Sequence, residues 1–249
     1  MGQPPRVKGS DGSGRRAAPA GERRYQIRPF RPADRPAVRH ICAACAWLGA
    51  PAPERIGDEW IWAEFWTRFF TDRHQRLSWV VADESSGRVV GYLTGTDDVR
   101  RFDRYVPFLL PGVLARVIRK RLLRRPTSRR ALLRLLRSFV RGELALPAGV
   151  ARRYPATFHV NLLPEARRRG LGRAMFERFL ARLQRLGVGG LHVQLLGVNR
   201  PIRAFCRRAG FRPIARSRLT AFEHLDGEPI EIAMWVRDVR GPAAGGAAL

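Results

Sequence analysis

The sequence is poor in cysteine and almost without lysine. Its three cysteines, Cys42, Cys45 and Cys206, are too few for a dense disulfide framework, so we expect reduced thiols. No apolar run approaches the roughly 20 residues that cross a bilayer, and residues 1–20 lack the apolar segment of a secretory signal. These absences predict a cytoplasmic protein.

Lysine is replaced throughout by arginine. Only Lys8 and Lys120 are lysines among 47 basic residues, which outnumber 21 acidic ones and give a formal charge of +26. Such a bias can reflect genome composition alone, which would leave a solvated basic surface without a partner. The charge equally fits an anionic partner, such as a coenzyme phosphate, nucleic acid or a membrane. Both interpretations stay open.

Length and composition predict one folded domain. The chain has 249 residues, of which 45% are hydrophobic, and this suffices for one core but hardly for two. Residues 1–22 are rich in Gly, Pro, Ser and Arg, and residues 239–249 are mostly Gly and Ala, so both ends are predicted to be disordered tails. The folded domain is expected at 23–238.

The apolar pattern predicts an α/β fold. Period-two alternation and β-branched residues predict about seven strands, and helical spacing predicts helices ending near Trp47 and at 58–73, 172–186 and 200–209. Because strands alternate with helices after residue 156, we expect a mostly parallel unit at the centre of a mixed sheet. A ligand site then belongs at the carboxyl ends of those strands. The strands are expected at 24–30, 77–83, 88–96, 156–163, 190–196, 213–223 and 229–237.

An arginine-rich segment at 98–154 separates the third and fourth strands. Its helical spacing is broken at Pro111, Pro126 and Pro147, so we expect a basic helical insertion. Leucine and valine repeat against arginine along it. Such a segment could clamp an acceptor, dock a partner subunit in a homodimer or lie on an anionic membrane.

The segment most indicative of function is a basic loop that joins a strand to a helix. A strand ends at Pro164, and a loop with Gly170 and Gly172 leads directly into an amphipathic helix. Glycines let a backbone approach an anion closely, while the free amides and dipole of a helix start attract it. The loop therefore predicts a pyrophosphate site.

Two common nucleotide motifs do not fit this loop. A P-loop requires Lys and then Ser or Thr after the last glycine, where this chain has Arg173-Ala174. A dinucleotide fingerprint requires a glycine at the position of Arg168. Both are excluded.

The loop resembles the Gln/Arg-x-x-Gly-x-Gly/Ala signature of the GNAT superfamily of acetyltransferases. Residues 167–172 read RRRGLG and follow the apolar-x-Pro ending Leu162-Leu163-Pro164. A second match is Asn199, followed by a segment that closes with Gly210-Phe211. More narrowly, residues 153–172 and the opening at 25–42 resemble the acetyltransferase-like domain of protein O-GlcNAcases and its stand-alone bacterial relatives.

The resemblance implies an N-acetyltransferase with acetyl-CoA as co-substrate and direct attack of an amine on the thioester. Backbone groups near the end of the fourth strand would pair with the pantetheine arm, and loop amides would hold the pyrophosphate. Asn199 would contact the arm or order a water. The coenzyme-binding residues so implied are Leu162, Leu163, Arg167, Arg168, Arg169, Gly170, Leu171, Gly172, Arg173 and Asn199.

The catalytic groups are less defined. The general base could be His159, Asp97 or Asp98. Cys206 stands where the superfamily often has a tyrosine that acts as general acid and protonates the departing thiolate of coenzyme A. Each residue also has a structural interpretation. His159 could be a hydrogen-bonded histidine within a strand, Asp97 and Asp98 could end a strand or cap a helix, and Cys206 could be a small buried residue.

Two further sequence features bear on metal binding and on the acceptor site. Cys42 and Cys45 form a C-x-x-C inside a predicted helix without a ligand set, so no metal site is expected. The tryptophan-rich segment at 60–70 is predicted to supply core and the wall of an acceptor site. The alternative to an enzyme is a non-catalytic protein of the same fold. Such a protein would use the basic insertion to bind nucleic acid, a membrane or a protein partner.

Overall fold

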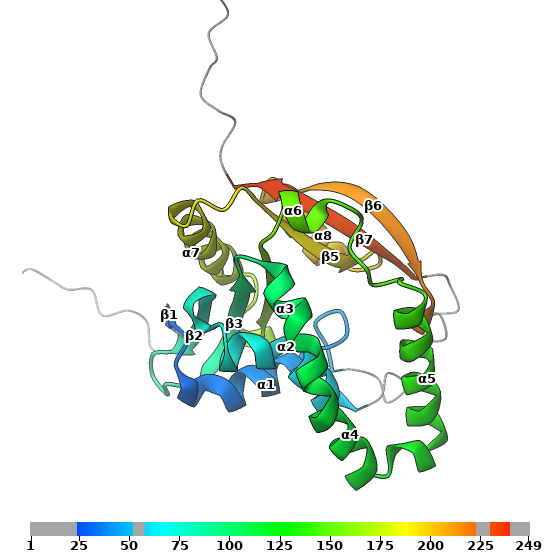
Figure 1. Cartoon of the computed structure of the whole chain (residues 1–249). Coiled ribbons are helices and arrows are strands. Elements are labelled where there is room, and N and C mark those ends of the chain that lie inside the picture. The colour runs from blue at the N-terminus through cyan, green and yellow to red at the C-terminus, as the bar shows by residue number, and fades with distance from the viewer. Residues whose placement is uncertain (1–23, 52–57, 223–229, 240–249) are drawn as a thin grey trace, which may run out of the picture.

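A computed structural model describes residues 24–51, 58–222 and 230–239 (Figure 1). The predicted tails at 1–22 and 239–249 lie outside these residues, except for Val239, which is buried in the fold. The first part of the chain forms β1 (Tyr25–Pro29), α1 (Arg35–Ala44), α2 (Glu59–Asp72), β2 (Ser78–Asp83) and β3 (Val89–Thr96). The helices α3 (Val99–Tyr105), α4 (Leu110–Arg119), α5 (Pro126–Val140) and α6 (Val150–Arg153) follow. The last part forms β4 (Thr157–Leu162), α7 (Leu171–Arg185), β5 (Gly190–Leu196), α8 (Arg200–Arg208), β6 (Arg212–Leu219) and β7 (Ile230–Asp238).

The strands form two sheets. The first has the order β1-β2-β3-β4 and the second the order β5-β7-β6, and every pairing within them is antiparallel. The tight β2–β3 turn is held by Asp83, whose carboxylate accepts from the amides of Ser85 and Ser86 at 2.9 and 3.1 Å. Predicted and observed strand positions agree except at β6, where residues 220–222, predicted as strand, form a 3-10 helix. Burial does not alternate along the central strand β3, because helices cover both faces and every residue of that strand is buried.

The prediction of a mostly parallel centre is wrong. β4 and β5 run parallel, but among the described residues they contact each other only at an isolated bridge between Ala156 and Leu191. Beyond it the two strands separate, and β7 pairs with β5 in antiparallel fashion. Phenylalanines fill the space between the sheets: Phe176 of α7 contacts the rings of Phe158, Phe205 and Phe211 at 5.2 to 5.8 Å.

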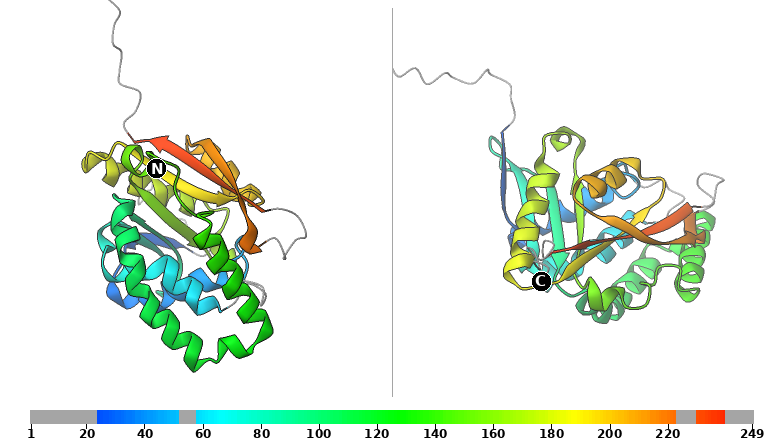
Figure 2. Two further views of the ribbon diagram at one scale, coloured as in Figure 1. Left: turned by 45° about the vertical axis from the view of Figure 1, so that its right-hand side comes forward. Right: turned by 90° about the horizontal axis from the view of Figure 1, so that it is seen from above.

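Helices cover both faces of the first sheet. The side chain of Phe158 packs against Phe179 of α7, whereas its neighbour His159 stacks on Trp66 of α2. Because successive strand residues point to opposite faces, α7 lies on one face and α2 on the other (Figures 1 and 2). Residues of β4 therefore reach two different environments.

The segment between β3 and β4 is helical, and α4 and α5 extend away from the sheets (Figure 2). Polar and apolar contacts attach it to the second sheet. The carboxylate of Glu143 accepts from Ser138 Oγ at 2.6 Å and from the amide of Thr220 at 2.8 Å. Leu135 and Leu144 pack against a small buried cluster, which consists of Leu219, Ala221 and Ile232. Whether the segment is an insertion relative to other proteins stays a prediction. Among the described residues, no helix has both the length and the apolar character that crossing a membrane requires.

Candidate functional site

The loop between β4 and α7 presents an unusual run of free amides. The amide groups from Arg168 to Arg173 donate to no described residue, and no side chain caps α7. Two residues adopt left-handed backbone, Arg168 with φ 60° and Gly170 with φ 75°. Left-handed residues between extended and helical ones gather successive N–H groups into a concave cradle, and the helix dipole adds partial positive charge. The geometry suits an anion.

Packing does not explain Gly172. A Cβ atom there would meet only Leu162 Cδ1 at 3.5 Å, an ordinary contact, and Gly172 lies inside a helix, where alanine is the better residue. Gly170 differs, because its positive φ favours glycine whatever the surroundings. A glycine without a packing role next to free amides is consistent with close approach of a ligand.

The loop arginines have separate tasks. The guanidinium of Arg167 points inward, where Nε donates to the carbonyl of Leu162 at 2.8 Å and Nη2 donates to the carbonyl of Gly49. Arg169 lies over the ring of Tyr25, and Arg173 pairs with Glu177 at 2.7 Å. Only Arg168 has an exposed side chain without a described partner. The side chain of Arg167 thus fastens the segment after α1 to the end of β4. The amide of Arg167, which was predicted to hold the pyrophosphate, donates to the carbonyl of Pro164 at 3.2 Å.

One edge of β4 is open. Ala156 donates to Gly190 at 3.2 Å and accepts from His192 at 2.9 Å, so its backbone faces β5. By strand alternation the backbone groups of Phe158, Val160 and Leu162 face the same way, yet β5 has separated from β4 there. We call these three residues the open edge. Every residue of β4 is partly exposed, although the strand lies at the centre of the fold.

The open edge corrects the predicted pantetheine contacts. The amide of Leu163 donates to Val90 at 2.9 Å and its carbonyl accepts from Ala166 at 3.0 Å, so no backbone group of Leu163 is free. The carbonyl of Leu162 accepts from Arg167. The available groups lie earlier in the strand than predicted, because Leu163 already turns into the loop.

His159 belongs to a buried polar chain. The hydroxyl of Tyr92 lies 3.0 Å from His159 Nδ1 and accepts from Asn161 Nδ2 at 3.0 Å. Tyr92 is fully buried, and burial lowers the pKa of His159 to about 4. The imidazole is therefore neutral at physiological pH, and Nε2 has no partner among the described residues. Strand alternation shows that His159 and Asn161 share a face, but no sequence signal indicated Tyr92.

The two aspartates are structural. Asp97 contacts His74, Arg76 and Arg101 at 3.0, 2.6 and 3.1 Å. Burial alone would raise the pKa of Asp97, but the hydrogen bond and charge of Arg76 and the charge of Arg101 lower it. Asp98 caps α3 by accepting from the amide of Arg100 at 3.0 Å. A carboxylate with three cationic or imidazole partners is a poor base, so the structure does not support the catalytic prediction for Asp97.

Cys206 and Asn199 also have structural tasks. Cys206 is 1% exposed within the core, and burial raises the pKa of its thiol to about 12. The structural alternative, a small buried residue, is the one that the structure supports. Asn199 caps α8, with Oδ1 accepting from the amide of Ile202 at 3.3 Å. Cys42 and Cys45 are likewise buried, and burial raises the pKa of Cys42 to about 12.

Aromatic residues line the His159 face of the first sheet. Trp66 stacks on His159 with ring centroids 5.4 Å apart, and Phe222 contacts Trp47 and Trp62 at 5.4 and 5.7 Å. Along α2, Trp62 and Trp66 are half-buried whereas Phe69 and Phe70 are buried. The helix thus supplies core at its end and an accessible aromatic surface at its start, as its composition predicted.

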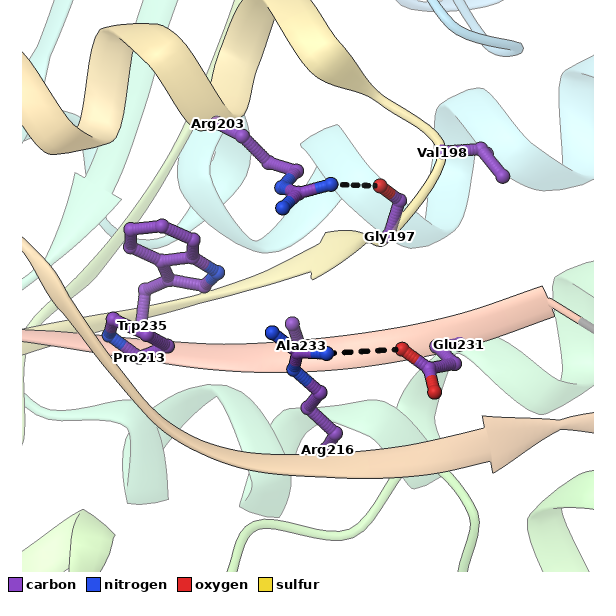
Figure 3. A pocket seen from close by; sticks show the side chains of 8 residues that line it. All are labelled: Gly197, Val198, Arg203, Pro213, Arg216, Glu231, Ala233 and Trp235. Carbon is purple, nitrogen blue, oxygen red and sulfur yellow. Dashed lines mark hydrogen bonds and ion pairs between the residues drawn. The ribbon is translucent and has the colours of Figure 1, made fainter.

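A small cavity of about 160 Å³ lies elsewhere, between α8 and the β6–β7 pair (Figure 3). Arg203 donates to the carbonyl of Gly197 at 2.9 Å at its rim, and Arg216 faces Glu231 at 3.7 Å. Neither His159 nor the β4–α7 loop lines it. The free amides and the open edge, rather than this cavity, define the candidate site.

Comparison with solved structures identifies the family. The chain is 30% identical to the protein SsHAT, with a TM-score of 0.66 over 87% of this chain and 99% of that one. It also matches yncA from Salmonella typhimurium with its cofactor acetyl-CoA (TM-score 0.52, 16% identity, 90% and 99% covered). A GNAT superfamily phosphinothricin acetyltransferase from Sinorhizobium meliloti, in complex with acetyl-CoA, gives a TM-score of 0.51 at 19% identity over 89% and 94%.

No family model matches the sequence. The similarity to SsHAT extends over nearly the whole of that chain. The protein belongs to the GNAT superfamily of N-acetyltransferases.

Proposed function

We propose that this protein transfers the acetyl group of acetyl-CoA directly to an amine. One observation carries the proposal: the open edge of β4 and the free amides of residues 168–173 lie on either side of one short turn, residues 163–167, whose own amides at Leu163, Ala166 and Arg167 are engaged. Together they offer donors for a diphosphate and a strand-like partner for an extended amide chain. Acetyl-CoA contains both, one after the other.

The diphosphate binds the loop amides and the start of the α7 dipole, with Arg168 adding a charge at the rim. The amide groups of the pantetheine arm pair with Val160 and Leu162 as an added strand would. Gly172 leaves room for the phosphates beside Leu162. This arrangement fixes the thioester next to β4, where most of the rate enhancement would come from positioning.

In the transfer step the amine nitrogen attacks the thioester carbonyl carbon, and the bond from that carbon to sulfur breaks. An N–H of the open edge polarises the carbonyl oxygen. The proton lost by the amine passes to water hydrogen-bonded to His159, since a neutral imidazole with a pKa of about 4 accepts a hydrogen bond but holds a proton weakly. The departing thiolate takes its proton from solvent. Cys206, at the position of the superfamily's general-acid tyrosine, is buried and does not serve as the proton donor.

The acceptor amine approaches over the aromatic surface formed by Trp47, Trp62, Trp66 and Phe222. Half-buried indoles favour an acceptor with an apolar or planar body beside its amine. The closer resemblance to the O-GlcNAcase domain remains a prediction from sequence, as does a homodimer.

Calorimetric titration with acetyl-CoA tests the proposal. We expect saturable binding by the unmodified protein and a loss of at least about tenfold in affinity for Gly170→Val, whose side chain would enter the loop. Gly187→Val is the matched control: Gly187 has φ 69° and ends the same helix, so backbone strain is similar but the loop is untouched. Absence of heat at about millimolar acetyl-CoA, well above the usual affinity range for such ligands, would refute the proposal.

A further inference from the structure

Exposed apolar side chains concentrate on the helices between β3 and β4. Among the described residues, thirteen large apolar side chains are exposed, and nine of them lie between positions 108 and 140. Scattered exposed leucines are normal on a protein surface, but this density on one segment is not. The nine are Phe108, Leu110, Leu114, Ile118, Leu123, Leu133, Leu136, Phe139 and Val140.

These residues form stripes along two helices. On α4, Leu110, Leu114 and Ile118 recur every fourth residue and are 62%, 59% and 67% exposed. Residues at this spacing lie on one face of a helix. On α5 a second stripe consists of Leu133, Leu136 and Val140, which are 47%, 58% and 77% exposed.

The stripe on α5 is not the face by which the helix attaches to the fold. Its buried residues are small: Ser128, Ala131 and Ser138, at the spacing of a different face. Ser138 is hydrogen-bonded to Glu143, which anchors the helix to Thr220. α5 therefore carries one face for the fold and a second, more hydrophobic face that no described residue covers.

Arginine surrounds the stripes. Residues 105–141 contain ten arginines, one lysine and no acidic residue. Only Arg116, with Asp58 at 3.0 Å, and Arg141, with Glu143 at 3.8 Å, pair with a described carboxylate. The other basic side chains, including Arg130 and Arg137 on α5, have no anionic partner among the described residues. The surface thus combines unpaired positive charge with exposed leucine and phenylalanine.

We propose that this surface, the α4–α5 surface of residues 105–141, docks the enzyme on an anionic lipid membrane. Amphipathic helices with arginine on their polar flanks lie in the headgroup layer of such membranes. The apolar stripes enter the boundary with the acyl chains, while the arginines contact lipid phosphates and remain near water. The helices extend away from both sheets, so docking leaves the β4–α7 loop accessible (Figure 2).

Other occupants fit the composition less well. A second copy would bring eleven positive charges against eleven more, which disfavours pairing of this surface with itself. The segments outside the described residues offer few large apolar side chains for such stripes. They contain only Met1, Val7, Ile56, Leu225 and Leu249. Nucleic acid would use the arginines but would leave the leucines in water.

Co-sedimentation of the full-length protein with vesicles tests this inference. We expect binding to phosphatidylcholine vesicles with about one third phosphatidylglycerol, and binding at least about tenfold weaker to phosphatidylcholine alone. The variant Leu133→Ser/Leu136→Ser should bind the anionic vesicles at least about tenfold more weakly, because its apolar stripe is lost. Arg130→Gln/Arg137→Gln should reduce the preference for the anionic lipid.

The matched control is Leu186→Ser/Ile214→Ser, which removes two apolar residues of 38% and 39% exposure from other elements and should bind as the unmodified protein does. Thermal unfolding of all variants confirms that they are folded. Equal binding to both kinds of vesicle, no binding, or full binding by Leu133→Ser/Leu136→Ser would overturn the proposal. So would a dimer in solution that this same variant dissociates, since a second copy would then occupy the surface.

Discussion

The indole of Trp66 lies over the imidazole of His159, with ring centroids 5.4 Å apart and planes inclined by 20°. One ring comes from α2 and the other from β4, so the contact joins the aromatic surface to the strand that carries the open edge. Trp66 is therefore placed between the proposed acceptor and the proposed thioester position.

The variant Trp66→Ala should raise KM for the acceptor amine about tenfold and leave the affinity for acetyl-CoA within about twofold, since the indole stacks on the His159 side chain rather than on the backbone of the open edge. Steady-state kinetics with a panel of amines and calorimetry with acetyl-CoA measure the two effects. Trp60→Ala is the control, because Trp60 lies on the same helix but faces Arg116. A parallel loss of acetyl-CoA affinity would place Trp66 elsewhere in the site.

Arg167 and Arg168 are neighbours with opposite expected roles. Arg167→Ala should lower the free energy of unfolding by about 1 to 3 kcal/mol, because carbonyls of Leu162 and Gly49 lose a charged donor. Arg168→Ala should change stability little and weaken acetyl-CoA binding several-fold. Urea unfolding and calorimetry of both variants separate these effects. The account is contradicted where Arg167→Ala proves neutral for stability.

Cys206→Ala should retain kcat within about twofold, because a core thiol whose pKa burial raises to about 12 does not contact the leaving group. Its cost should appear in stability, at about 1 kcal/mol for the lost sulfur. Steady-state kinetics and thermal unfolding measure both quantities. A fall in kcat of about a hundredfold with normal folding would show instead that the thiol acts in the reaction.

Stability should fall on mild acidification. Burial lowers the pKa of His74, His159 and His192, so between about pH 6.5 and 4 the unfolded chain binds protons that the folded chain does not. The contribution of His159 is fully present above pH 6.5 and is lost as the pH falls toward 4, amounting to at most about 3 kcal/mol.

Urea unfolding of His159→Gln at about pH 7 and about pH 5 checks this. The variant should lose less stability between the two pH values than the unmodified protein. His40→Gln, on the exposed face of α1, is the control and should keep the original dependence. Identical losses in His159→Gln and the unmodified protein would mean that His159 does not carry the effect.

Local sequence patterns predicted most of the fold. Strand and helix positions followed from periodicity, and the loop at Gly170 followed from its glycines and the helix behind it. The antiparallel arrangement did not, because strand order depends on pairing between segments far apart in the sequence, as between β5 and β7, which no local pattern encodes. Tyr92 was missed for the same reason: its partner His159 is 67 residues away.

The coenzyme site was likewise predictable only in part. The resemblance assigned the pyrophosphate to the amides from Arg167 to Gly172, and in the structure the amide of Arg167 donates to Pro164. Sequence could not show this bond, the inward turn of the Arg167 side chain or the engagement of both backbone groups of Leu163. Asp97 was a candidate base because it is a carboxylate at the end of a predicted strand. Its partners His74 and Arg76 lie between α2 and β2, and Arg101 lies in α3. Only the folded chain brings these residues together.

The central claim is that free backbone amides of β4 and its following loop hold acetyl-CoA. Residue-resolved amide hydrogen exchange by NMR, with and without acetyl-CoA, tests it most directly. The account predicts slower exchange at Val160, Leu162 and the amides of 168–173, and little change at the matched helix end near Gly187. The account is contradicted when saturating acetyl-CoA does not slow exchange at these amides. It is also contradicted when exchange slows only at residues around the cavity beneath α8.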